Sequence, residues 1–326
     1  MTNDKAQILV SICCITYNHA AFICKALDGF LMQQPPSCVP QGAKMSDWCE
    51  ILIHDDCSTD GTTEIVKEYA AKYPDVIFPL YEEVNQYSKG VKVDFYNYNR
   101  ARGRYIAYCE GDDYWTDPNK LLKQVDFMDA HPNYSVCWHR VEVVDASDTY
   151  IRPGHADDLF VNQQSANGLD IDIPTFFRNW YTQPCSMVIR RASLDYSWHT
   201  MYKTYCDTYE IYHLLKSGKG HILNFVGAKY RMHQGGVASS MDEMQGCLSE
   251  LGYIEELYHL NKDSYTKNYW QSVLLWTVET LNHNGKYQLI LRVIWKEFKL
   301  FPLQTIRICS ILCKRSIKAY VKKYLK

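Results

Sequence analysis

Three short apolar runs that end abruptly in polar or acidic residues constrain this chain more than any other feature of its sequence. Residues 8–15 and 105–109 are nearly continuous in apolar side chains, and residues 50–54 have an apolar centre at 51–53, which is typical of strands covered on both faces. Soon after each run comes a polar pair, in order Tyr17-Asn18, Asp55-Asp56 and Asp112-Asp113. Segments with helical periodicity separate the runs, and this alternation predicts a parallel α/β sheet. Because ligands bind beyond the carboxyl ends of strands in such sheets, we expect a ligand site where these polar residues meet.

The third run is followed by three carboxylates, Glu110, Asp112 and Asp113, around Gly111. Unpaired carboxylates near an apolar layer are strongly disfavoured, so such a cluster is typical of a site that a cation neutralises. Hard divalent ions such as Mg²⁺ and Mn²⁺ take one or two carboxylates together with phosphate oxygens of a substrate. The alternative is a solvated turn before a helix that starts near Pro118.

The usual glycine-rich phosphate loops are absent from the sequence. It contains neither a GxxxxGKS/T motif nor a GxGxxG turn after the first run. A bound nucleotide would therefore be held by side-chain acids and a metal. The net charge of -2 gives no indication of nucleic-acid binding, and 47% hydrophobic with 22% charged residues is ordinary for a globular protein.

Three segments, taken in order, resemble the family 2 inverting glycosyltransferases, which have a GT-A fold. They are Val10-Ser11-Ile12 through Thr16-Tyr17-Asn18, then residues 55–62 (Asp55-Asp56-Cys57-Ser58-Thr59-Asp60-Gly61-Thr62), then Arg102-Gly103 through Glu110-Gly111-Asp112-Asp113-Tyr114-Trp115. The match covers roughly residues 1–145. The resemblance implies an α/β fold with a Rossmann-like mixed sheet flanked by helices, in an enzyme of the bacterial cell-surface polysaccharide type.

The resemblance also implies roles for individual residues. Tyr17 is expected to stack on or lie beside the nucleobase, and Asp56 to bond the base. Asp112 is expected to meet the ribose or the metal, and Asp113 to ligate the Mn²⁺ or Mg²⁺ that bridges the diphosphate. The residues assigned to nucleotide-sugar binding are Thr16, Tyr17, Asn18, Asp55, Asp56, Arg102, Glu110, Asp112 and Arg231. Core packing is the alternative for Tyr17 and a turn role for Asp55, while Glu110 stands where the family often has an aspartate.

A helix is predicted from Asp207 to a glycine stop at Gly218. A carboxylate at a helix N-terminus is favoured by the dipole and by free N–H groups, so a plain capping role for Asp207 is one reading. The family's catalytic base is an acid that opens such a helix, with a Tyr-Arg-x-His segment after the next strand, here residues 230–233. The resemblance therefore implies that Asp207 is the base and that His233 contacts metal or phosphate. Glu210 is the rival base, and a structural role is the alternative for His233.

The rest of the chain predicts an acceptor half and a helical region. We expect strands at residues 135–144 and 184–191, with a polar irregular stretch, residues 145–172, on the acceptor side. Helices are predicted at residues 244–260, 265–284, 286–300 and 304–325. The expected domains are therefore a GT-A domain, residues 1–240 (a nucleotide-binding half, 1–115, and an acceptor half, 116–240), and a C-terminal helical region, residues 241–326.

The C-terminal end is strongly basic, with ten lysine and arginine residues and one acid, Glu297, in residues 291–326. A basic amphipathic helix of this kind can lie on an anionic membrane surface; the alternative is a bundle helix with a solvated cationic face. The polar start of the chain resembles no signal peptide, and the thirteen cysteines include no CxxC pair. We therefore expect reduced thiols and a cytoplasmic protein, with a peripheral position on the inner face of the cell membrane as a further expectation.

The expected function is metal-dependent, inverting transfer of a sugar from a nucleotide-diphosphate donor to an acceptor hydroxyl. A UDP-sugar is the expected donor, and a sugar or a lipid-linked molecule the acceptor, in surface polysaccharide or glycan synthesis. One alternative is a nucleotidyltransferase that makes nucleotide sugars, although such enzymes carry a basic glycine-rich loop where this chain has residues 16–19. The other is a non-catalytic nucleotide- or carbohydrate-binding protein of the same fold.

Overall fold

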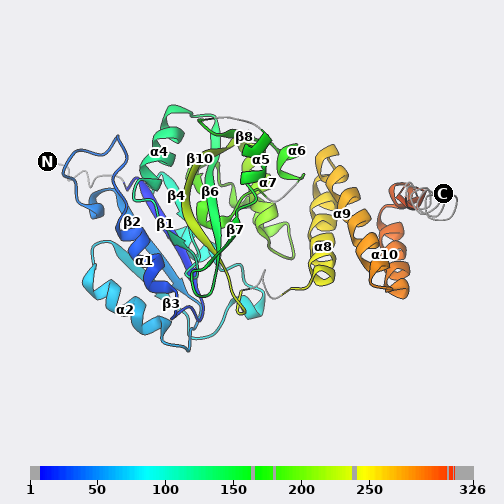
Figure 1. Ribbon diagram of the computed structural model, residues 1–326, viewed down its shortest axis with the longest axis horizontal. Coiled ribbons are helices and arrows are strands. Elements are labelled where there is room, and N and C mark those ends of the chain that lie inside the picture. The colour runs from blue at the N-terminus through cyan, green and yellow to red at the C-terminus, as the bar shows by residue number, and fades with distance from the viewer. Residues whose placement is uncertain are drawn as a thin grey trace. The chain divides into compact units, whose positions relative to one another are not determined.

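Figure 1 shows the computed structural model of the chain, which describes residues 8–162, 166–178, 181–236, 241–306, 308–310 and 312. The chain forms two compact units, Met1–His233 and Gln234–Lys326. The predicted domain boundary after residue 240 falls in a stretch, residues 237–240, that lies outside the described residues.

The first unit is a ten-stranded sheet with helices packed on it. Its strands are β1 (Val10–Thr16), β2 (Cys49–Asp55), β3 (Ile77–Tyr81), β4 (Tyr105–Tyr108), β5 (Tyr114–Trp115), β6 (Tyr134–Asp145), β7 (Tyr150–Pro153), β8 (Leu169–Ile171), β9 (Val188–Arg190) and β10 (Lys219–Met232). Its α-helices are α1 (Ile23–Leu31), α2 (Thr62–Lys72), α3 (Asp94–Arg100), α4 (Lys120–Ala130), α5 (Asp157–Asn162), α6 (Ile173–Phe176) and α7 (Asp207–Ser217).

The sheet is mixed, as the resemblance implies. Its order is β3-β2-β1-β4-β9-β6-β10-β5, with β7 paired to β6 and β8 paired to β10. Strands β3, β2, β1 and β4 are parallel to one another, and β6 is parallel to β10. The pairs β4–β9 and β6–β9 are antiparallel, so β9 joins the two parallel parts.

The core explains why the apolar runs form strands. On one face of β1, Val10, Ile12 and Cys14 are fully buried and belong to the same apolar cluster as Leu27 of α1 and Val125 of α4. Successive side chains of a strand point to opposite faces of the sheet, and helices cover both faces of these strands. Neither face is exposed to solvent, so residues on both faces are apolar. This packing carries the parallel strands to a common edge.

Two stretches differ from the predictions. Only Val188–Arg190 of the strand predicted at residues 184–191 is extended, because Pro184 cannot donate to a ladder and begins a 3₁₀ turn instead. Residues 145–172, predicted as irregular, contain β7, α5 and β8. A tight turn in which Asp145 accepts hydrogen bonds from the N–H groups of residues 147 and 149 folds β7 back on β6. Strand β7 pairs with β6 along one edge and is largely exposed, so its sequence does not alternate between apolar and polar residues.

The second unit contains α8 (Glu243–Asn261), α9 (Ser264–His283) and α10 (Tyr287–Leu300), which confirms three of the predicted helices. Asp242 and Asp263 cap α8 and α9 by accepting hydrogen bonds from the N–H groups of Gln245 (2.7 Å) and Thr266 (2.8 Å). Residues 302–306 and 308–310 are helical, and most of the basic tail predicted as a helix over residues 304–325 lies outside the described residues.

Candidate active site

The carboxyl ends of the parallel strands bring the predicted polar residues to one edge. In the register of β1 and β2, Thr16 lies beside Asp55. The N–H of Gly111 donates to the carbonyl of Ile15 (2.9 Å), which fixes the acidic turn against the end of β1. A Cβ at Gly111 would lie 2.7 Å from Oγ1 of Thr16, so only glycine allows this approach.

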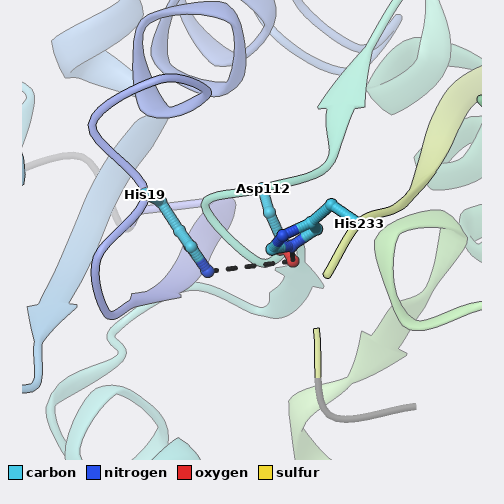
Figure 2. Close-up of side chains that lie close together, drawn as sticks. All are labelled: His19, Asp112 and His233. Atoms are coloured by element: carbon cyan, nitrogen blue, oxygen red, sulfur yellow. Dashed lines mark hydrogen bonds and ion pairs between the residues drawn. The ribbon is translucent and has the colours of Figure 1, made fainter. Parts of the chain in front are cut away.

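Asp112 lies between two histidines that come from distant parts of the chain (Figure 2). His19 follows β1, and His233 follows the long strand β10. The Oδ2 atom of Asp112 is 3.0 Å from Nε2 of His233 and 3.8 Å from Nε2 of His19. Side-chain atoms of the three residues all lie within 4.8 Å of one another, a spacing at which they could hold one metal ion.

The electrostatics of this group fit a cation. Burial alone would raise the pKa of Asp112, but the hydrogen bond from His233 and the nearby His19 hold it below its usual value. Burial lowers the pKa of His19, which keeps its imidazole neutral and able to ligate. The buried Oδ1 of Asp112 and Nδ1 of His19 have no hydrogen-bond partner among the described residues, so the group is incompletely satisfied as it stands.

The structure places Asp113, the predicted principal metal ligand, outside this three-residue group. Asp113 is 1% exposed, and its Oδ1 accepts a hydrogen bond from the backbone N–H of Arg231 (2.7 Å). Burial and the neighbouring Asp112 raise the pKa of Asp113, against the opposing effect of the Arg231 N–H and the Cys185 thiol. Oδ1 of Asp113 thus ties the acidic turn to β10, while its buried Oδ2, like Oδ1 of Asp112, has no hydrogen-bond partner among the described residues.

Arg231, predicted to contact the donor, directs its guanidinium into the protein. It donates to the carbonyls of Asp112 (2.8 Å) and Asp145 (3.0 Å) and to the carboxylate of Asp148 (2.7 Å). The guanidinium also lies over the ring of Phe22, 4.5 Å from its centroid. These contacts favour a positioning role for Arg231, which holds the backbone of Asp112, over the predicted diphosphate contact.

Arg102 lies at the opposite edge of the sheet, and this position contradicts its predicted role in nucleotide-sugar binding. It immediately precedes β4, and its Nε donates to Glu50 (2.7 Å) at the start of β2. Ser11 at the start of β1 donates to the same carboxylate (2.6 Å). Parallel strands have their amino ends on one edge and their carboxyl ends on the other, so Arg102 is a strand length away from Asp112.

The remaining predicted residues build the loops around the edge. Oδ1 of Asn18 accepts a hydrogen bond from the Thr59 N–H (2.8 Å), and Asp55 accepts from the Ser58 N–H (3.1 Å), so both shape the turn after β2. The two carboxylate oxygens of Asp56 accept from the N–H groups of Gln86 (2.6 Å) and Tyr87 (2.9 Å). Tyr17 is 44% exposed, which excludes the core-packing alternative and leaves its ring open to a planar ligand.

A second carboxylate group lies around the start of α7. Burial, followed by the nearby Asp94, raises the pKa of Asp207 to about 7. Burial and Asp94 also raise the pKa of Glu210 to about 8, although the Tyr205 hydroxyl donates to it (2.9 Å). Burial raises the pKa of Glu110, and Asp112, Asp113, Asp207 and Asp94 add to this, so the acidic turn and α7 share one electrostatic environment. The raised pKa of Asp207 suits the general-base role that the resemblance implies.

Sequence reasoning missed His19, Asp94 and Tyr87 as site residues. Asp94 is 8% exposed at the start of α3, and the Tyr108 hydroxyl donates to it. Tyr87 is 57% exposed, and after burial the charges of Glu110, Asp207 and Asp94 add to the rise of its pKa. The position of His19 in the sequence could have identified it as a site residue, because it directly follows Thr16-Tyr17-Asn18 at the end of an apolar run.

Comparisons with known proteins agree with this geometry. The sequence pattern of "Glycosyl transferase family 2" matches residues 11–198. Rv1520 of Mycobacterium tuberculosis is 45% identical over 136 residues, which cover 41% of this chain and 36% of that protein. The putative teichuronic acid biosynthesis glycosyltransferase TuaG of Bacillus subtilis is 37% identical over 128 residues, covering 39% of this chain and 44% of TuaG. The chain thus matches less than half the length of these curated relatives.

Two solved structures share the fold. Staphylococcus aureus TarS (residues 1–349) aligns with a TM-score of 0.57 and 16% identity, covering 85% of this chain and 74% of that one. The mannosyltransferase PcManGT of Pyrobaculum calidifontis, in complex with GDP-Man and Mn²⁺, aligns with a TM-score of 0.55 and 14% identity, covering 97% and 81%. At this identity the likeness concerns the fold alone, and it confirms the predicted GT-A class with C-terminal helices.

Proposed function

Because this chain belongs to glycosyl transferase family 2, we propose that it transfers a sugar, with inversion, from a nucleotide-diphosphate donor to an acceptor hydroxyl in the synthesis of a surface polysaccharide or glycan. One observation carries the proposal. The group His19–Asp112–His233 and the poised carboxylate Asp207 share the electrostatic environment at the carboxyl edge of the parallel strands. Ligand sites of open α/β sheets form at this edge.

We assign a divalent cation to His19, Asp112 and His233. The unsatisfied Oδ1 of Asp112 and the neutral His19 fit such an ion. When bound, the ion supplies positive charge and Lewis acidity for the diphosphate of the donor. Two imidazoles beside one carboxylate suit Mn²⁺ and later transition metals better than Mg²⁺, which prefers oxygen ligands. Mn²⁺ is therefore the ion we expect of the two.

Asp207 is the proposed base. Its carboxylate accepts the proton of the acceptor hydroxyl as that oxygen attacks the anomeric carbon and the donor diphosphate leaves. A single displacement with one base and no covalent intermediate inverts the anomeric centre. The raised pKa of about 7 brings Asp207 close to the pH at which a base is most effective.

The donor class is the open part of the proposal. TarS has been solved with UDP-GlcNAc and PcManGT with GDP-Man, so uridine and guanosine diphosphate sugars are the first to test. The proposed acceptor is a sugar or a lipid-linked molecule at the inner face of the cell membrane. Among the described residues, no helix has both the length and the apolar content needed to cross a bilayer.

Calorimetry with a set of UDP-, GDP- and dTDP-sugars, each titrated with and without Mn²⁺, tests the proposal. We expect one nucleotide class to bind tightly only with Mn²⁺. Asp112→Asn and His19→Ala should lower the Mn²⁺ affinity by tenfold or more, whereas His131→Ala, an exposed histidine elsewhere, should have no effect. Asp113→Asn separates the two metal assignments, because a loss as large as that of Asp112→Asn would restore Asp113 as a ligand. Absence of binding for every donor would refute the proposed function.

A further inference from the structure

Helix α10 in the second unit exposes an apolar stripe. Tyr287, Leu291, Trp295 and Phe298 recur at helical spacing, and their side chains are 64%, 71%, 59% and 37% exposed. Leu291, Trp295 and Phe298 of the stripe, with Ile294, Thr305, Ile306 and Cys309, line an open groove of about 370 Å³. Single exposed apolar residues are ordinary in a protein surface, but a continuous stripe of large ones marks an interaction surface.

The charges around this stripe have one sign. Arg292 and Lys299 are exposed, and at helical spacing both fall on one flank of the stripe. The Nζ of Lys299 lies 5.3 Å from the centroid of the Trp295 ring. Lys296 is already paired with Glu255 (2.5 Å).

The only acid of the helix points the other way. Glu297 is completely buried, and its carboxylate accepts a hydrogen bond from the indole of Trp270 on α9 (3.0 Å). No exposed carboxylate of α10 therefore balances its cations. Beyond the helix, the sequence continues with seven more lysine and arginine residues and no acid.

We propose that this face of α10 (the α10 face) docks onto an anionic phospholipid surface, with Leu291 and Trp295 entering the interface and Arg292 and Lys299 contacting headgroup phosphates. An apolar face bordered by cations, with an indole at the boundary, is the arrangement that amphipathic helices use at the membrane interface. A second copy of the chain fits less well, because self-association through this face would bring cations together without any exposed acid to pair with them. The inference deepens the proposed membrane-bound acceptor but needs no catalysis to be tested.

The test is flotation of the full-length chain with vesicles of phosphatidylcholine, with and without phosphatidylglycerol. We expect binding only to the anionic vesicles at low salt, and release at high salt. Arg292→Gln with Lys299→Gln should weaken binding roughly twenty-five-fold, at about fivefold per cation near an anionic surface. The matched control is Lys67→Gln with Lys72→Gln, two exposed lysines of α2, which should bind as the wild type does.

The apolar contact is tested with Tyr287→Ser and Leu291→Ser together, against Val84→Ser and Ile151→Ser, which are also exposed. The first pair should weaken flotation by tenfold or more and the second should not. Brominated lipids should quench tryptophan fluorescence in the wild type and much less in Trp295→Phe.

The proposal fails if the wild type does not float. It also fails if deletion of residues 313–326 abolishes flotation while the Tyr287 and Leu291 changes do not weaken it. A dimer that the two serines dissociate, with no vesicle binding, would assign the face to a second copy. A wild type that binds donor but does not float would refute this inference and leave the proposed function standing.

Discussion

The pH dependence of transfer gives the most direct access to the role of Asp207. Its pKa of about 7 lies well above the usual 3.8 because burial and Asp94 disfavour the ionised form. A base acts only when deprotonated, so the rate should rise with pH through about 7. For one titrating group, roughly a tenth of the molecules are ionised at pH 6, half at pH 7 and nine-tenths at pH 8. The turnover number should therefore increase about tenfold from pH 6 to a plateau near pH 8.

Three variants separate this explanation from others. Asp207→Asn should lose at least about a hundredfold in turnover while donor binding stays within a few-fold of wild type. Asp94→Asn removes the second cause of the raised pKa, so the midpoint of the profile should move to lower pH. Asp75→Asn, a change at an exposed carboxylate in the loop before β3, is the control. Its midpoint should stay where it is.

The assay is turnover at saturating donor between pH 5.5 and 8.5, with Mn²⁺ occupancy followed by electron paramagnetic resonance at each pH. That second readout separates titration of the base from loss of the bound ion. A flat profile at constant Mn²⁺ occupancy would mean that Asp207 has an ordinary pKa or is not the base. If Asp207→Asn transfers sugar normally and Glu210→Gln does not, the base is Glu210.

Two further predictions concern the frame around the site. Lys120 is fully buried, with its Nζ 4.0 Å from the ring centroid of Trp115. Burial lowers the pKa of Lys120 from 10.5 to about 7. Lys120→Met should therefore stabilise the fold at pH 6 by roughly 3–5 kcal/mol. Because the folded state binds fewer protons between pH 7 and 10.5, this advantage should shrink by pH 9, and urea unfolding at both pH values would contradict the reasoning if the difference were constant. Arg102→Gln should leave donor affinity unchanged but cost about 1–3 kcal/mol of unfolding free energy, since Glu50 loses its charged partner at 1% exposure. Loss of donor binding in calorimetry without loss of stability would return Arg102 to the site.

The convergence of the strand ends could be predicted because it depends on local pattern alone. An apolar run followed by acids indicates both a buried strand and the edge at which it ends, and the structure places Asp55 and Asp112 on that edge as expected. The position of Arg102 was equally readable, because a residue that precedes a strand lies at its amino edge. The prediction that Arg102 binds the nucleotide sugar followed the family motif and disregarded the strand direction, and it was wrong.

The grouping of His19, Asp112 and His233 could not be predicted in the same way. His19 and His233 come together only because β1 and β10 belong to one sheet, and no sequence pattern reports a pairing of such long range. Asp94 looked like an ordinary helix start, since acids are common in first turns. Its effect on Asp207 arises from burial among other carboxylates, which depends on how α3 and α7 pack and not on any spacing in the sequence.

The metal group also has a mechanical consequence. His19 and His233 lie near the two ends of the sheet-forming part of the chain, so an ion held by both would act as a reversible cross-link across nearly the whole first unit. Such a link exists only while the chain is folded, so unfolding must also release the ion. An ion that binds only the folded chain at a hundred times its Kd stabilises it by about 2.7 kcal/mol. The supply of free metal would then set how long the protein survives as well as whether it can hold its donor.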